Sequence, residues 1–115
     1  MWTTEGATAV EDLIKYLKEK KDAEKLHPLL WSEPLAKAST DFAKAQGPTG
    51  KRGHNGPDGS TTKSRIDAAM KEFNKNSEKS IGENIQYING SPLMALMYLA
   101  IDDSVPSREN RNKIF

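Results

Sequence analysis

Apolar side chains recur at helical spacing near the start of the chain. The first stripe is formed by Val10, Leu13, Ile14 and Leu17. The solvent-facing side of this helix is predicted to carry Lys15, Lys18, Glu19 and Lys20. Thr8 and Glu11 have the spacing of a capping box, in which a hydroxyl and a carboxylate satisfy backbone donors of the first turn. The pattern predicts a helix that begins near Thr8.

A second helix is predicted after Ser32. Ser32 suits the N-cap, Pro34 suits the first turn, and the Trp31 indole is placed to staple the start of the helix. The buried stripe of this helix consists of Leu35, Ala38, Phe42 and Ala45. Gly47 and Pro48 are expected to end it, because glycine accepts the left-handed conformation and proline cannot continue a helix.

A long loop is predicted next. Five glycines and two prolines lie within residues 47–59, and at that frequency the segment shows neither the helical nor the alternating strand pattern of apolar residues. His54 lies at the centre of this loop. Loops of this length inside compact domains are usually either functional or disordered, and the histidine favours a functional loop.

The pattern then predicts a short helix, a strand and a turn. The helix follows cap candidates at residues 60–62, and its apolar stripe is Ile66, Ala69, Met70 and Phe73. Residues 81–88 are rich in β-branched and aromatic side chains, which favour a strand. Asn89 and Gly90 are typical of the turn that closes such a strand.

A fourth helix is predicted after Ser91 and Pro92. Residues 93–101 are apolar almost all round, which is typical of a central helix buried between two layers. Ser107 is placed to cap one further turn, in the segment that ends at Phe115.

Composition excludes several classes of protein. The 115 residues suit one domain, and 17 basic against 16 acidic residues give a formal charge of +1. That balance argues against a broad nucleic-acid or anionic-membrane surface. With no cysteine, thiolate zinc sites, disulfides and cysteine nucleophiles are excluded. The apolar stretches are too short for a transmembrane segment, and the start of the chain has no secretory leader pattern.

His54 and Glu83 are the residues that carry candidate chemistry. Neutral imidazole binds transition metals and relays protons, and a nearby carboxylate fixes its tautomer or adds a ligand. The alternative is that both residues only form structural hydrogen bonds. Phosphate-loop, nucleophile-elbow and His-Glu-x-x-His signatures are missing from the sequence.

Four blocks of sequence, in this order, resemble successive blocks of the CAP superfamily, which includes cysteine-rich secretory proteins, antigen 5 and pathogenesis-related class 1 proteins. The blocks are residues 30–38, residues 53–60 with 65–66, residues 82–85 and residues 101–115. The resemblance therefore covers the chain from Leu30 onward. It implies an α+β fold, an α-β-α sandwich in which helices flank a small antiparallel sheet; as present, the chain is expected to be largely helical with an incomplete sheet. Residues 1–29 precede the blocks and are expected to form an N-terminal helix and connector.

The resemblance also implies a cavity that gathers two His and two Glu residues, sometimes around a divalent metal. His54 and Glu83 match one residue of each kind. Asn110 stands where the second His is usual, and the second Glu has no clear counterpart, although Asp58 and Asp67 are near in sequence. An Asn amide is a poor ligand for zinc or copper. We therefore expect no cofactor beyond a weakly held divalent metal at His54 and Glu83.

The family pattern continues into further strands after its last block, so residues 1–115 are expected to form a single domain of this type that is incomplete at its C-terminal side. Another polypeptide is then expected to supply or cover the missing strands. The favoured function is a noncatalytic protein-binding module or a structural subunit of a larger assembly, with an intracellular location slightly preferred. The alternatives are a secreted lipid-, sterol- or receptor-binding protein and a divalent-metal-assisted hydrolase that uses His54 and Glu83.

Overall fold

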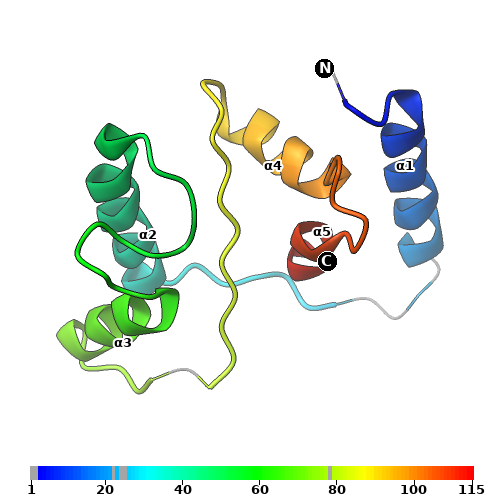
Figure 1. Ribbon diagram of the computed structural model, residues 1–115. Coiled ribbons are helices and arrows are strands. Elements are labelled where there is room, and N and C mark those ends of the chain that lie inside the picture. The colour runs from blue at the N-terminus through cyan, green and yellow to red at the C-terminus, as the bar shows by residue number, and fades with distance from the viewer. Residues whose placement is uncertain (1–2, 22, 24–25, 78) are drawn as a thin grey trace. The chain divides into compact units, whose positions relative to one another are not determined.

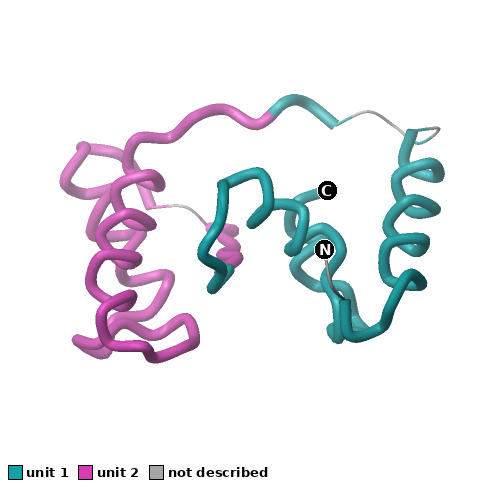
Figure 2. Tube along the Cα trace, turned by 90° about the horizontal axis from the view of Figure 1, so that it is seen from above, with its two compact units in different colours: residues 1–28, 86–115 teal, residues 29–85 magenta. Residues whose placement is uncertain are grey.

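The computed structural model describes residues 3–21, 23, 26–77 and 79–115. Parts of the predicted N-terminal connector therefore lie outside the described residues. The helices are α1 (Ala7–Lys21), α2 (Glu33–Gln46), α3 (Thr62–Glu72), α4 (Pro92–Ile101) and α5 (Glu109–Ile114), with a short 3-10 helix, η1 (Gly47–Thr49) (Figure 1). The chain divides into two compact units. We call residues 29–85 the central unit and residues 1–28 with 86–115 the terminal unit (Figure 2).

The predicted sheet is wrong. Within the described part of the chain no residue forms a β-strand, and residues 81–88 run as irregular backbone. The side chains of this segment do have strand propensity, but a strand exists only where a second strand completes its hydrogen-bond ladder. Because no described segment pairs with residues 81–88, the α+β fold and its antiparallel sheet are replaced by a helical architecture.

The core of the central unit lies between α2 and α3, which pack against each other. Its buried members are Ala38, Ile66, Ala69 and Met70. Two of these four are alanines, and small side chains allow two helices to approach closely. Ile81 packs against this cluster from the irregular segment, so part of the predicted strand serves as a cover for the helix pair.

The predicted ends of α2 and α3 are largely confirmed. Ser32 is the N-cap residue of α2, and Thr61 caps α3 in a reciprocal capping box with Ser64. Two details differ from expectation. Gly47 has a right-handed backbone, and the left-handed residue is Gly50 (φ 66°), because η1 extends the helix by one turn before the chain leaves it.

The start of α2 is held by a polar contact instead of an apolar staple. The Trp31 indole N–H donates a hydrogen bond to the Glu33 carboxylate at 2.8 Å. The Trp31 ring itself remains 79% exposed. The indole is therefore fixed at the surface of the central unit and does not cover the helix start.

The terminal unit is built around α4, which packs against both α1 and α5. Ala9, Ala100 and Ile101 are its buried apolar residues. Arg111 on α5 is only 2% exposed. It donates hydrogen bonds to the α4 carbonyls of Ala100 (2.6 Å) and Ile101 (2.9 Å). This side chain satisfies carbonyl groups that the end of a helix leaves without intrahelical partners.

The predicted burial of α4 is wrong for its first half. Its large residues at positions 93, 94, 96 and 97 are all exposed. The fifth helix forms as predicted, but Arg108 stands at its N-cap in a left-handed conformation (φ 51°), where Ser107 was expected. α4 is thus buried at its C-terminal end and exposed to solvent at its N-terminal end.

Candidate functional site

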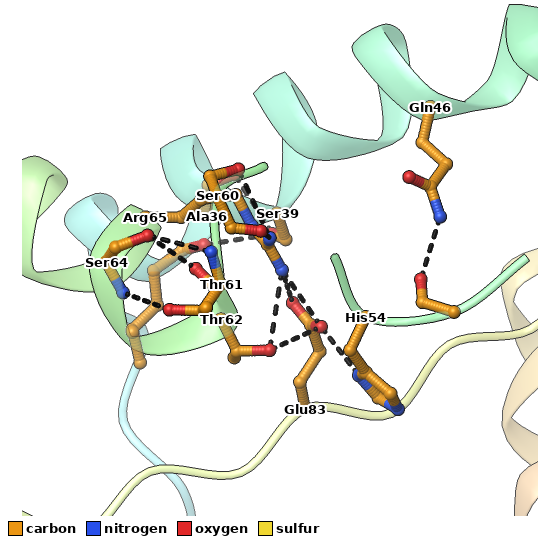
Figure 3. A network of polar contacts seen from close by, with 12 residues as sticks. Ala36, Ser39, Gln46, His54, Ser60, Thr61, Thr62, Ser64, Arg65 and Glu83 are labelled. Atoms are coloured by element: carbon orange, nitrogen blue, oxygen red, sulfur yellow. Dashed lines mark hydrogen bonds and ion pairs between the residues drawn. The ribbon is translucent and has the colours of Figure 1, made fainter. Parts of the chain in front are cut away.

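The central unit brings His54 and Glu83 together, as the sequence suggested. His54 Nδ1 lies 2.8 Å from Glu83 Oε1, although 29 positions separate the residues in sequence. Figure 3 shows His54 reaching from the glycine-rich loop and Glu83 from the segment that follows α3. The His54 side chain is about half exposed and the Glu83 side chain is mostly buried.

Two residues at the start of α3 hold the carboxylate of Glu83. Arg65 donates to both of its oxygens, at 3.1 Å and 3.0 Å, and the Thr62 hydroxyl donates at 2.9 Å (Figure 3). Thr62 and Arg65 are three positions apart, so the first turn of α3 presents both on one face. The capping residue Thr61 fixes where that turn begins.

Arg65 is itself locked in place. Its guanidinium lies 3.8 Å from the centre of the Phe42 ring, and it donates to the Ser60 carbonyl at 3.1 Å. A guanidinium stacked on an aromatic face is stabilised by the ring quadrupole. Arg65 therefore joins α2, the loop before α3 and Glu83 in one network.

The electrostatics of this network favour an ionised Glu83. Desolvation by burial acts to raise the pKa of Glu83, but hydrogen bonds from His54, Arg65 and Thr62, together with the Arg65 charge, outweigh it and lower that pKa. The carboxylate is therefore a permanent counter-ion for Arg65 at neutral pH.

The backbone around His54 is set by the neighbouring glycines. The Gln46 side chain, buried at the end of α2, donates to the Gly53 carbonyl at 2.7 Å. Gly53 adopts a φ of 114°, which residues with a Cβ rarely reach. These two features direct the loop so that His54 meets Glu83.

The other predicted site residues have separate roles. Asp58 accepts a hydrogen bond from the Ser60 backbone N–H at 2.9 Å, and its pKa is lowered chiefly by hydrogen bonds from Ser60. Asn110 belongs to the terminal unit, where its side-chain amide donates to Asp102 at 2.8 Å. Asp67 pairs with Lys63, one turn away on α3. The side chains that contact Glu83 in the network described above are His54, Thr62 and Arg65, so of the expected site residues the structure brings His54 and Glu83 together.

A metal ion at this site would draw on His54 and Glu83. Among the described residues no group of three or more His, Cys, Asp and Glu side chains converges on a point where an ion could bind. Glu83 already accepts from Arg65 with both oxygens, so an ion would compete with that guanidinium for the carboxylate. Beside Glu83 lies a pocket of about 220 Å³, whose lining includes Leu35, Ser39 and Ile66.

Sequence reasoning did not identify Arg65 and Thr62 as partners of Glu83. A signal was present, because the capping motif at Thr61 places Thr62 and Arg65 on one face of the first helical turn. What the sequence did not provide was the approach of the segment containing Glu83 to that face.

Comparison with known proteins adds no assignment: no family model, no curated protein and no solved structure matches the chain. In the part of the chain that the structure describes, no helix has the length and apolar character needed to cross a membrane.

Proposed function

We propose that the chain is a noncatalytic protein-binding module or structural subunit, and that the open half of α4 is the surface that its partner covers. The observation that carries this proposal is the exposure of four large apolar side chains on one short helix. Leu93 is 65% exposed, Leu96 48%, Met97 43% and Met94 42%. We call these four residues the α4 patch.

The α4 patch continues a face that is already used for packing. On a helix, residues 93, 97, 100 and 101 project to the same side. Ala100 and Ile101 are buried in the terminal unit, whereas Leu93 and Met97 on that side are open. A partner that covers Leu93 and Met97 would therefore extend the apolar contact that Ala100 and Ile101 already make on the same face of α4.

The chemistry of the patch indicates an apolar polypeptide surface as its occupant. From Gly90 to Ile101 the chain carries no charged residue. A nucleic acid or an anionic surface would find no Lys or Arg to contact there. Complete burial of a Leu or Met side chain contributes about 1.5–3 kcal/mol, and flexible Met side chains adapt to an irregular partner.

The His54 network supports a noncatalytic role. A catalytic carboxylate–imidazole relay would need Glu83 to act mainly on His54, but here Arg65 binds both of its oxygens. The ordered series of blocks that resembles the CAP superfamily also supports a binding role, since that family includes many binding proteins. We therefore propose that His54 and Glu83 tie the glycine-rich loop to the rest of the central unit.

Site-specific photo-crosslinking in the cells that express the chain tests this proposal. A photo-reactive residue would replace Met97 or Leu93, and the matched control would carry it in place of Lys18, on the exposed side of α1. We expect one polypeptide, identified by mass spectrometry, to be captured from positions 93 and 97 and not from position 18. Capture of a lipid or sterol, of a second copy of the chain, or of the same products from all three positions would contradict the proposal.

A further inference from the structure

Three dipeptides in this chain have the sequence that favours attack of the backbone on a side chain. They are Asn55-Gly56, Asp58-Gly59 and Asn89-Gly90. In each, the amide nitrogen of glycine can reach the side-chain carbonyl carbon of the preceding residue, because glycine has no Cβ to obstruct the approach. This attack closes a five-membered succinimide ring. The ring forms only if the backbone is free to rotate and the glycine nitrogen is accessible.

The first two dipeptides are fixed by one tight turn. The Gly56 N–H donates to the Ser60 carbonyl at 2.8 Å, and the Gly59 N–H donates to the Gly56 carbonyl at 3.0 Å. Side chains also pack closely around Gly56, because a Cβ at this position would lie 2.7 Å from Asp58 Oδ1. Both glycine nitrogens are therefore engaged in hydrogen bonds and held away from the geometry of attack.

The third dipeptide has no such restraint. Asn89 and Gly90 are both exposed, and they follow the irregular segment that forms no strand ladder. Within the described part of the chain, no backbone carbonyl accepts a hydrogen bond from the Gly90 N–H. The turn that the sequence predicted here would have been locked by its two strands, and without them the dipeptide can rotate.

We propose that Asn89 is a site of spontaneous deamidation and that Asn55 is protected from it by the fold. The Gly90 nitrogen loses its proton and attacks Asn89 Cγ, and the side-chain amide leaves as ammonia, which gives a succinimide. Water then opens the ring at either carbonyl, so that residue 89 becomes an isoaspartate or an aspartate. No other reactant is required.

The product places a carboxylate just before α4. Residue 89 lies two positions before Ser91, the N-cap of α4, where the helix macrodipole favours a negative charge. The same carboxylate introduces a charge beside the otherwise uncharged α4 patch. Deamidation thus changes a surface to which the proposed function assigns a role, but the reaction itself does not depend on that function.

The test is peptide mapping of the purified full chain after incubation in mildly alkaline buffer, with isoaspartyl and aspartyl products separated before mass spectrometry. In the folded chain we expect Asn89 to convert at least about fivefold faster than Asn55, the factor that one protecting hydrogen bond supplies. In urea the two rates should become equal. The variant Gly90→Ala, which the backbone at that position accepts, should suppress conversion at residue 89.

Two results would overturn the proposal. One is conversion of Asn55 in the folded chain at the rate of Asn89. The other is an Asn89 that stays intact in the folded chain, whether or not it converts in urea. Neither result depends on whether a polypeptide binds the α4 patch. The crosslinking experiment can therefore contradict the proposed function while the deamidation proposal stands, and the reverse also holds.

Discussion

Replacing Glu83 by Gln should destabilise the central unit without changing its shape. Glu83 accepts hydrogen bonds from three side chains, and its charge balances that of Arg65. Glutamine keeps one acceptor oxygen for His54 and Thr62, but its amide group presents hydrogen atoms to the Arg65 guanidinium, which contacts both carboxylate oxygens. The variant Glu83→Gln therefore removes the counter-ion and turns favourable contacts into repulsive ones.

The exposure of the pair sets the size of the effect. The Arg65 and Glu83 side chains are 11% and 17% exposed, which places them between a surface pair and a buried one. Surface pairs contribute about 0–1 kcal/mol, and breaking a buried pair costs about 3–5 kcal/mol. We expect a loss of about 2 kcal/mol, which corresponds to roughly a 30-fold change in an equilibrium constant.

Hydrogen exchange of the full chain measures this loss locally. Backbone amides of α2 and α3 should exchange roughly 30-fold faster in Glu83→Gln, because His54, Thr62 and Arg65, which contact Glu83, all lie in the central unit. Amides of α1 and α5 should be unchanged. Glu72→Gln is the matched control, since Glu72 forms only an exposed pair with Lys37 at 3.5 Å. Equal exchange in α2 and α3 for both variants would refute the reasoning.

The pH dependence of the same amides follows from the lowered pKa of Glu83. The unfolded chain binds the proton more readily than the folded chain does, so the stability contributed by Glu83 is complete above the ordinary carboxylate pKa. It is lost as the pH falls through the lower pKa of the folded state. Protection of α2 and α3 should therefore decline on acidification, and the Glu83→Gln variant should lack this part of the decline.

Three further predictions concern other contacts. Arg111→Leu should destabilise the terminal unit by about 3 kcal/mol, because it leaves two α4 carbonyls without their donor and reduces the ion pairs of Asp12 to the one with Arg108, and urea denaturation followed by circular dichroism measures this. Thr61→Ala removes the cap of α3 and should cost about 1 kcal/mol, seen as faster exchange confined to its first turn. Elemental analysis of the purified chain should find no stoichiometric zinc, since Arg65 occupies the Glu83 carboxylate, and a one-to-one content that resists mild chelation would contradict this.

Helices were predictable from the sequence because their signals are local. Ser32, Thr61 and Ser91 each mark a helix start that the structure has at the same place. At Thr61 and Ser91 the side chain accepts from a backbone N–H within one turn. At Ser32, whose side chain makes no such bond, a proline in the first turn marks the start, so no distant segment is needed. The pair of His54 and Glu83 could also be named from the sequence, first from the chemistry of the two residue types and then from the resemblance to the CAP superfamily, although their spacing in the chain does not show that they meet.

The sheet and the surroundings of α4 could not be predicted in the same way. Residues 81–88 have strand propensity, yet whether they form a strand depends on a partner elsewhere. Residues 93–101 are apolar on every side, which predicts burial but does not say what covers them. In both segments the sequence gives a local preference whose outcome depends on a second segment. For residues 81–88, no described segment forms the ladder that a strand needs.

The affinity of the crosslinked polypeptide for variants of the α4 patch tests the central claim most directly. Leu93→Asp removes the most exposed apolar residue of the patch and places a charge on it. By titration calorimetry with the purified partner, we predict a loss of affinity of about tenfold or more for Leu93→Asp, from the burial of one Leu side chain. The control Lys18→Asp should bind like the unmodified chain. Unchanged affinity of a folded Leu93→Asp variant would contradict the account.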